Sequence, residues 1–109
     1  MKRTLVMYTR TMGCPFVTTA KRVLAEHGVP YREVYIDRDP QAKQRLMLWV
    51  GFQSVPTLIA VDGDAVTPYE DPSPLERGAS PRGINRGSMI TEPNIEQLET
   101  WLRQHGFIA

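Results

Sequence analysis

The sequence predicts a single α/β domain in which strands alternate with helices. An apolar run from Thr4 to Tyr8 is followed by a helical pattern and then by a second strand-like run, as in a right-handed strand–helix–strand unit. A second helical pattern and another apolar run come next, and a capped helix closes the pattern. A length of 109 residues suits one hydrophobic core, so we expect one domain over residues 1–109.

The first half of the chain contains a strand, a helix and a second strand. Residues 4–8 favour a strand and show no polar alternation, which predicts a strand covered on both faces. The first helix is expected from Pro15 to His27, because proline suits a first helical position and Gly28 can end the helix. The second strand is expected from Tyr31 to Ile36.

The second half repeats the alternation. A helix is expected from Pro40 to Val50, and a strand is expected over residues 54–61. Asn94 and Gln97 have the spacing of a capping box and predict the start of a last helix that ends near Gly106. The apolar side of this helix is expected to consist of Ile95, Leu98, Trp101 and Leu102.

An irregular insertion at about 63–87 separates the third strand from the last helix. It is rich in proline and glycine and is too long for an ordinary hairpin loop. It is either a solvated loop that pairs its own charges, or a segment whose arginines reach the active-site face. The fourth strand is expected at Met89–Thr91, which leads into the last helix, with residues 65–67 as the alternative. The charged residues of the insertion include Glu70, Asp71, Glu76, Arg77, Arg82 and Arg86.

Cys14 is the only cysteine and the centre of the predicted functional site. Because it precedes Pro15, it should lie at a helix N-terminus, where backbone N–H groups and the helix dipole favour a nucleophilic thiolate. First-turn N–H groups and the cation Arg10 are the expected stabilisers of that thiolate. A small buried cysteine is the alternative. One cysteine excludes an internal disulfide, so redox chemistry needs a partner thiol.

Composition gives no sign of a charged or apolar partner surface. The net charge is +1 with both signs spread along the chain, so we expect no nucleic acid and no membrane partner. The N-terminal residues lack the apolar stretch of a signal peptide, which predicts a cytoplasmic protein. We also expect it to be a monomer. His27 and His105 each precede a glycine that can end a helix and are expected to cap helices, so no metal site is predicted.

Several motifs resemble those of a glutaredoxin. They are Tyr8-Thr9-Arg10, Cys14-Pro15-Phe16-Val17, Ser54-Val55-Pro56-Thr57 and Thr91-Glu92-Pro93-Asn94. The resemblance covers nearly the whole chain except the insertion. It implies a thioredoxin-like fold, in which three helices surround a mixed four-stranded sheet of order 2-1-3-4. It also implies a cis peptide bond before Pro56.

The resemblance further implies a glutathione site and a catalytic cysteine at position 14. Glutathione would be the co-substrate, and glutathionylated or disulfide-bearing proteins would be the clients. The Val55 backbone would pair with glutathione as an added strand does. The substrate-binding residues implied in this way are Arg10, Pro15, Phe16, Val55, Pro56, Thr91 and Asn94.

The chain departs from the family pattern in three places, and the third determines the expected mechanism. The loop before Cys14 is one residue longer than usual, and the Gly-Gly-acidic sequence before the last helix is missing. Val17 replaces the second cysteine, which leaves a monothiol cycle. Two alternatives stay open: a carrier in which two protomers and two glutathiones hold an iron–sulfur cluster through Cys14, and a redox-inactive binding module. Cluster carriers of the family typically have Cys-Gly-Phe-Ser, from which Pro15 and Val17 depart.

Overall fold

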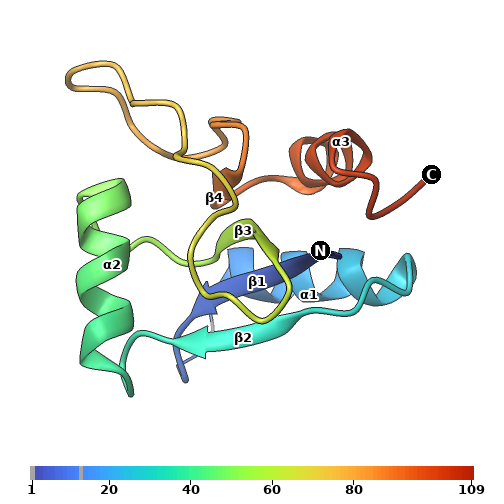
Figure 1. Ribbon diagram of the computed structural model, residues 1–109, viewed down its shortest axis with the longest axis horizontal. Coiled ribbons are helices and arrows are strands. Elements are labelled where there is room, and N and C mark those ends of the chain that lie inside the picture. The colour runs from blue at the N-terminus through green and yellow to red at the C-terminus, as the bar shows by residue number, and fades with distance from the viewer. Residues whose placement is uncertain (1, 13) are drawn as a thin grey trace.

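A computed structural model describes residues 2–12 and 14–109 and contains a four-stranded mixed sheet with three helices (Figure 1). The strand order is β2-β1-β3-β4. The first strand pairs in parallel with the second and antiparallel with the third, which pairs antiparallel with the fourth. This arrangement confirms the predicted order. The strands are β1 (Arg3–Thr9), β2 (Arg32–Tyr35), β3 (Thr57–Asp62) and β4 (Met89–Thr91).

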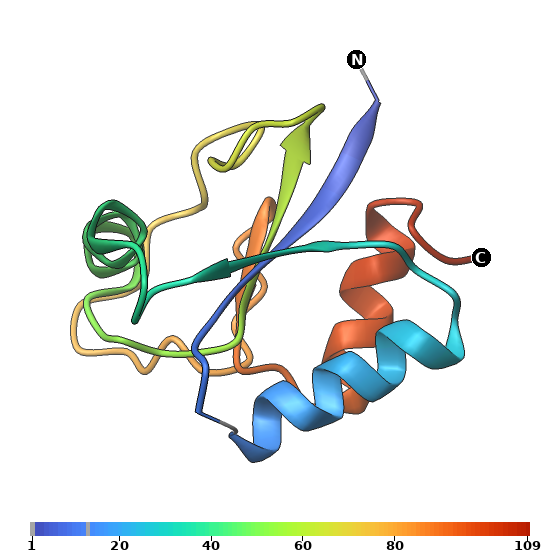
Figure 2. The same cartoon turned by 90° about the horizontal axis from the view of Figure 1, so that it is seen from below.

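The helices cover both faces of the sheet. Helices α1 (Pro15–Glu26) and α3 (Ile95–Gln104) lie side by side on one face, and α2 (Pro40–Val50) lies on the other (Figure 2). Residues 5–9 of β1 are all buried, as predicted for a strand covered on both sides. The result is the expected thioredoxin-like fold. None of the helices in the described part of the chain is long and apolar enough to cross a membrane.

Local signals place the helix boundaries. The Asp39 side chain accepts hydrogen bonds from the first turn of α2, and Gly51 ends that helix with φ 85°. Asn94 and Gln97 form the predicted capping box of α3, with both hydrogen bonds at 2.8 Å. Ile95 is a correction, because its side chain is 43% exposed while the other three residues predicted on the apolar side are buried.

The third strand begins later than predicted. Residues 54–56 lie outside β3, and the ladder starts where Thr57 faces Tyr8 of β1 and Thr91 of β4. Pro56 has no N–H to donate to a ladder, which accounts for a start after this residue.

Both histidines are C-cap residues, as predicted. His27 ends α1, and its Nε2 lies 2.8 Å from Glu99 Oε2 of α3. His105 ends α3, and its Nε2 lies 2.7 Å from the carbonyl oxygen of Gly87. The same carbonyl accepts a hydrogen bond from the indole of Trp101 at 2.8 Å. The two histidines therefore join helix ends to neighbouring segments.

The second half of the insertion runs beside β4 (Figure 1). Arg82 forms an isolated bridge with Thr91, and Asn85 forms one with Ile90. The Ser88 hydroxyl donates to the carbonyl of Glu70 at 2.7 Å, which joins the residue after the insertion to the first half of the insertion. The insertion is thus attached to the sheet.

Arg86 anchors the insertion to α2. Its side chain is buried, at 6% exposure, and burial lowers the pKa of its guanidinium. The guanidinium donates to the carbonyls of Ser73 at 2.7 Å and Trp49 at 2.6 Å. Because Trp49 lies in the last turn of α2, its carbonyl has no acceptor role inside the helix, and a cation there is favourable. Arg86 therefore satisfies backbone groups of two separate segments.

Replacing Arg86 should destabilise the domain. In Arg86→Ala the two carbonyls lose their donor, and we expect the free energy of unfolding to fall by about 2 to 4 kcal/mol. Urea unfolding followed by far-UV circular dichroism measures this change. Arg77→Ala is the matched control, since Arg77 is an exposed arginine of the same segment and should change stability by less than about 0.5 kcal/mol. Equal stability of the Arg86 variant and the natural protein would contradict the anchoring role.

Candidate functional site

Cys14 lies at the predicted helix N-terminus. It is the N-cap residue of α1, and its side chain is partly exposed. Its Sγ lies 3.8 Å from the carbonyl oxygen of Val55, to which the thiol donates. The side chain receives no hydrogen bond from the first turn, contrary to the expected N–H contacts to sulfur. The thiol is instead directed at the Val55 carbonyl. Gly13, directly before Cys14, lies outside the described residues.

The segment that faces the sulfur is the peptide before β3. The Val55–Pro56 bond is cis, as the resemblance implies, and both residues are buried. The Thr57 hydroxyl donates to the carbonyl of Ser54 at 2.9 Å, which closes the turn in front of the strand. The structure therefore brings the backbone of Val55 beside Cys14.

Arg10 is exposed, and within residues 2–12 and 14–109 it has no ion-pair partner. The next residue, Thr11, donates its backbone N–H to Asp37 Oδ2 at 3.0 Å. Desolvation raises the pKa of Asp37, but hydrogen bonds from Thr11 and from its own backbone, together with the charge of Arg38, hold the pKa below its ordinary value of 3.8. The loop that carries Arg10 is thus fixed to the end of β2 by a charged acceptor.

Thr91 and Asn94 have roles inside the fold. The Thr91 side chain is fully buried and shares a hydrogen bond of 3.0 Å with the Thr57 hydroxyl, so it offers no surface to a ligand. The Asn94 side-chain oxygen accepts from Gln97, which leaves its amide nitrogen for other contacts. Asn94 also lines a cavity with Phe16, which lies two residues after Cys14.

Two charged residues lie at the site beside the predicted ones: Arg82, one of the insertion arginines for which contact with the active-site face was an alternative, and Glu92, which was not assigned. Arg82 of the insertion lies over the Phe16 ring, with its Cζ 5.0 Å from the ring centroid. Arg82 Nε also pairs with Glu92 Oε2 at 2.9 Å. Glu92 follows β4 in a left-handed conformation, with φ 44°, and its N–H donates to the Pro56 carbonyl at 2.8 Å. The opposite charges of the two residues were the available signal, but nothing in the sequence pairs them.

The glutaredoxin family model matches residues 5–66, which is more than half of the chain. This chain belongs to the glutaredoxin family. Its match includes Cys14, the Val55–Pro56 peptide and the three elements between them, α1, β2 and α2, and it ends near the start of the insertion. Glutaredoxins are thiol–disulfide oxidoreductases that use glutathione as co-substrate and act on disulfide-bearing client proteins. Thiol–disulfide chemistry is therefore the function that the family supports.

Two solved structures align with 94% of this glutaredoxin. One is the holo form of glutaredoxin C1 from Populus tremula x tremuloides, which is 16% identical, is covered over 76% of its length and gives a TM-score of 0.47. The other is the solution structure of glutaredoxin from Brucella melitensis, which is 17% identical, is covered over 80% and gives a TM-score of 0.46. No curated protein matches the chain.

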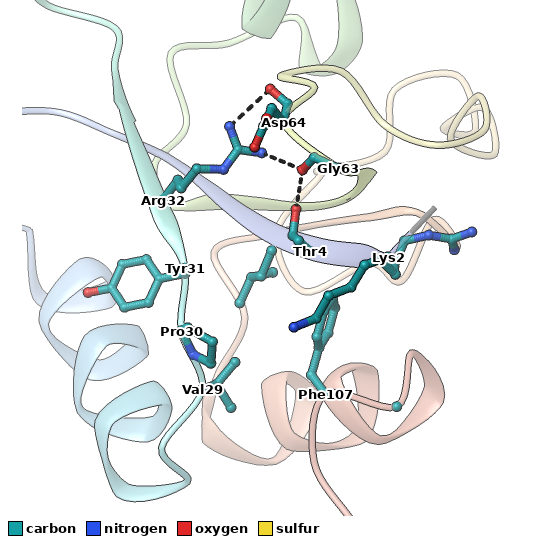
Figure 3. A pocket seen from close by; sticks show the side chains of 12 residues that line it. Lys2, Thr4, Val29, Pro30, Tyr31, Arg32, Gly63, Asp64 and Phe107 are labelled. Atoms are coloured by element: carbon teal, nitrogen blue, oxygen red, sulfur yellow. Dashed lines mark hydrogen bonds between the residues drawn. The ribbon is translucent and has the colours of Figure 1, made fainter.

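A separate cavity of this glutaredoxin, of about 470 Å³, lies at the opposite end of the sheet (Figure 3). It is lined by the start of β1, whereas Cys14 follows the end of that strand. Arg32 in its wall donates to the carbonyls of residues 63–65 at 2.8–3.2 Å. The Thr4 hydroxyl also donates to Gly63. These polar groups hold the turn after β3 and take no part in the thiol site.

The charge of Asp37 should contribute to stability in a pH-dependent way. Because its pKa is lowered in the folded protein, the carboxylate stabilises the fold above its unfolded pKa, and this contribution is lost as the pH falls through the folded value. Asp37→Asn keeps a neutral acceptor for Thr11. We expect it to melt at a lower temperature than the natural protein at pH 7, with the difference shrinking below about pH 4. Thermal unfolding at several pH values measures this, and a difference that does not change with pH would contradict the role of the charge.

Proposed function

We propose that this chain is a glutathione-dependent oxidoreductase that reduces protein–glutathione mixed disulfides by a monothiol mechanism through Cys14. The observation that carries the proposal is the position of the only thiol. It is partly exposed at the N-terminus of α1, with its sulfur 3.8 Å from the Val55 carbonyl. A second thiol in the chain is absent, and the residue three positions on is Val17. Glutathione must therefore supply the second sulfur.

The cycle consists of two thiol–disulfide exchanges. The Cys14 thiolate attacks the glutathione sulfur of a client mixed disulfide, the old S–S bond breaks, and the client thiolate leaves with the electron pair and takes a proton. Cys14 is then bonded to glutathione. A second glutathione thiolate attacks the glutathione sulfur of this adduct, which releases Cys14 as a thiolate and forms glutathione disulfide. The net reaction converts one client–glutathione mixed disulfide and one reduced glutathione into the client thiol and glutathione disulfide.

The surroundings of Cys14 favour a thiolate and the binding of glutathione beside it. The helix dipole of α1 favours a negative charge on a sulfur at its N-terminus. The Val55 backbone lies beside the sulfur and can pair with the peptide groups of glutathione as an added strand would. Pro15 is exposed and Phe16 half-exposed next to the sulfur, so they can form one rim of the binding surface. Arg10 is exposed on the loop before Cys14 and can meet a carboxylate of the peptide.

The setting that fits this chemistry is a reducing one. Glutathione is the electron donor, so we place the protein in the cytoplasm, where a reduced glutathione pool is maintained. We propose that it acts there as a monomer on glutathionylated client proteins. In the cluster-carrier alternative, one chain would supply only one sulfur ligand, and a second copy would have to supply another.

Cys14→Ser should abolish the activity. With a glutathionylated peptide, reduced glutathione and glutathione reductase, the natural protein should consume NADPH, while Cys14→Ser should leave only the uncatalysed rate. The reason is that an alcohol does not replace a thiolate as nucleophile in disulfide exchange. Alkylation of Cys14 before the assay is the control and should have the same effect.

Three results would count against the proposed function. Full activity of Cys14→Ser would show that another group carries the reaction. A lack of turnover together with a coloured dimer, formed with iron, sulfide and glutathione, would favour the cluster carrier. A lack of turnover, of cluster and of any Cys14 adduct by mass spectrometry would favour the redox-inactive binding module.

A further inference from the structure

The cavity of about 470 Å³ at the end of the sheet opposite to Cys14 has no part in the thiol cycle (Figure 3). Its apolar lining comes from Leu5 of β1, from residues 29–31 after α1 and from Phe107 after α3. Small-molecule sites in proteins are mostly apolar cavities of about 300 to 1,000 Å³, with a few polar groups that orient the ligand. The cavity therefore has the size and the lining of a second binding site.

The two apolar walls of the cavity are fixed by the ends of helices. After α1, the N–H of Val29 donates to the Leu24 carbonyl at 2.9 Å, and after α3 the N–H of Phe107 donates to the Leu102 carbonyl at 2.9 Å. Each bond is the longer one of a Schellman motif, which holds the residue beyond the helix end in place. A ligand between these walls enters a site that is already formed, so little free energy is lost to ordering the protein.

The charged groups that line the cavity are three cations and one carboxylate, Asp64. Arg3 is neutralised, because its Nε pairs with Asp62 Oδ1 at 3.0 Å. Lys2 and Arg32 have no ion-pair partner among the residues that the structure describes. Arg32 donates only to neutral backbone carbonyls, through its two terminal nitrogens. An excess of positive charge is therefore left in the cavity.

Lys2 is the cation that a ligand can reach. Its backbone carbonyl accepts a hydrogen bond from the Gly63 N–H at 2.9 Å, which fixes its position at the start of β1. Its side chain is exposed and points into the cavity (Figure 3). The C-terminal ends of α1 and α3 disfavour an anion, but this effect is a partial charge that fades within one turn. The Lys2 ammonium carries a full charge and sets the preference of the cavity.

We propose that this cavity binds a small aromatic carboxylate, with its ring between Val29 and Phe107 and its carboxylate on Lys2. The ring gains from burial against the apolar walls and from contact with the Phe107 ring. The carboxylate gains from the ammonium of Lys2 and from the uncompensated charge of Arg32. A neutral aromatic molecule lacks the second contribution, and a small anion lacks the first. The site is independent of the thiol chemistry, so the inference goes beyond the proposed function.

Three probes separate the contributions of the ring and the charge. They are 2-naphthoate, its uncharged analogue 2-naphthamide, and acetate, which has the charge without the ring. Each is titrated into the protein and followed by ¹H–¹⁵N NMR, which reports both the dissociation constant and the residues affected. We expect 2-naphthoate to shift the signals of residues 2–5, 29–32 and 106–107 and to leave residues 54–56 unchanged. It should bind about tenfold more tightly than 2-naphthamide, and acetate should not saturate the site.

The variants assign each contribution to a residue. Lys2→Gln should lower the preference for 2-naphthoate over 2-naphthamide from about tenfold to about threefold, since only Arg32 then remains. Phe107→Ala should weaken both aromatic probes by the same factor. Lys43→Gln is the matched control, because it removes an exposed lysine of α2 and should keep both affinities. Cys14→Ser should also bind as the natural protein does. Far-UV circular dichroism confirms that each variant is folded.

Four results would overturn the inference. The first is that none of the probes binds, and the second is that the natural protein binds 2-naphthoate and 2-naphthamide equally. The third is an equal loss of preference in Lys43→Gln and Lys2→Gln, since the effect would then be general attraction of anions. The fourth is loss of binding in Cys14→Ser, or shifts confined to residues 54–56, which would place the ligand at the thiol site. Turnover of glutathionylated substrate is measured separately, so its failure would leave this inference intact.

Discussion

The pairing of β3 with both β1 and β4 determines where the functional site is. Thr57, the first residue of β3, lies opposite Tyr8 near the end of β1 and opposite Thr91 at the end of β4. Because both ladders are antiparallel, the segments after β1, before β3 and after β4 meet at the same end of the strands. Cys14, Val55 and Glu92 lie on these three segments. The buried hydrogen bond between the Thr57 and Thr91 hydroxyls joins the start of β3 to the end of β4, next to two of these segments.

The elements that depend on local signals were predictable from the sequence. The second helix spans Pro40–Val50 as predicted, and the capping box of the last helix is present. The fourth strand lies at Met89–Thr91. Each of these predictions depends on a hydrophobic periodicity, a capping residue or a turn residue that lies within a few positions of the element. The position of Cys14 at a helix start follows in the same way from the proline beside it.

The contacts that cross the chain were not predictable. Arg82 and Glu92 are ten residues apart, and only the return of the insertion along β4 brings them together. Thr91 has the polarity of a binding residue, but its burial depends on the register between β3 and β4. The place of the Val55 backbone beside Cys14 was implied by the family resemblance, and no local pattern in the sequence predicts it. Local patterns in the sequence predicted the helices and strands, whereas the contacts at the site depend on how the strands pair.

The path of the insertion beside β4 has a consequence for association between chains. An edge strand with unpaired backbone groups can pair with the edge of another molecule. In this fold β4 and β2 are the two edges of the sheet. The bridges from Arg82 and Asn85 occupy positions along β4, and β2 is only four residues long and carries Arg32 and Glu33. Short length and charge protect one edge from intermolecular strand pairing, and the folded insertion protects the other.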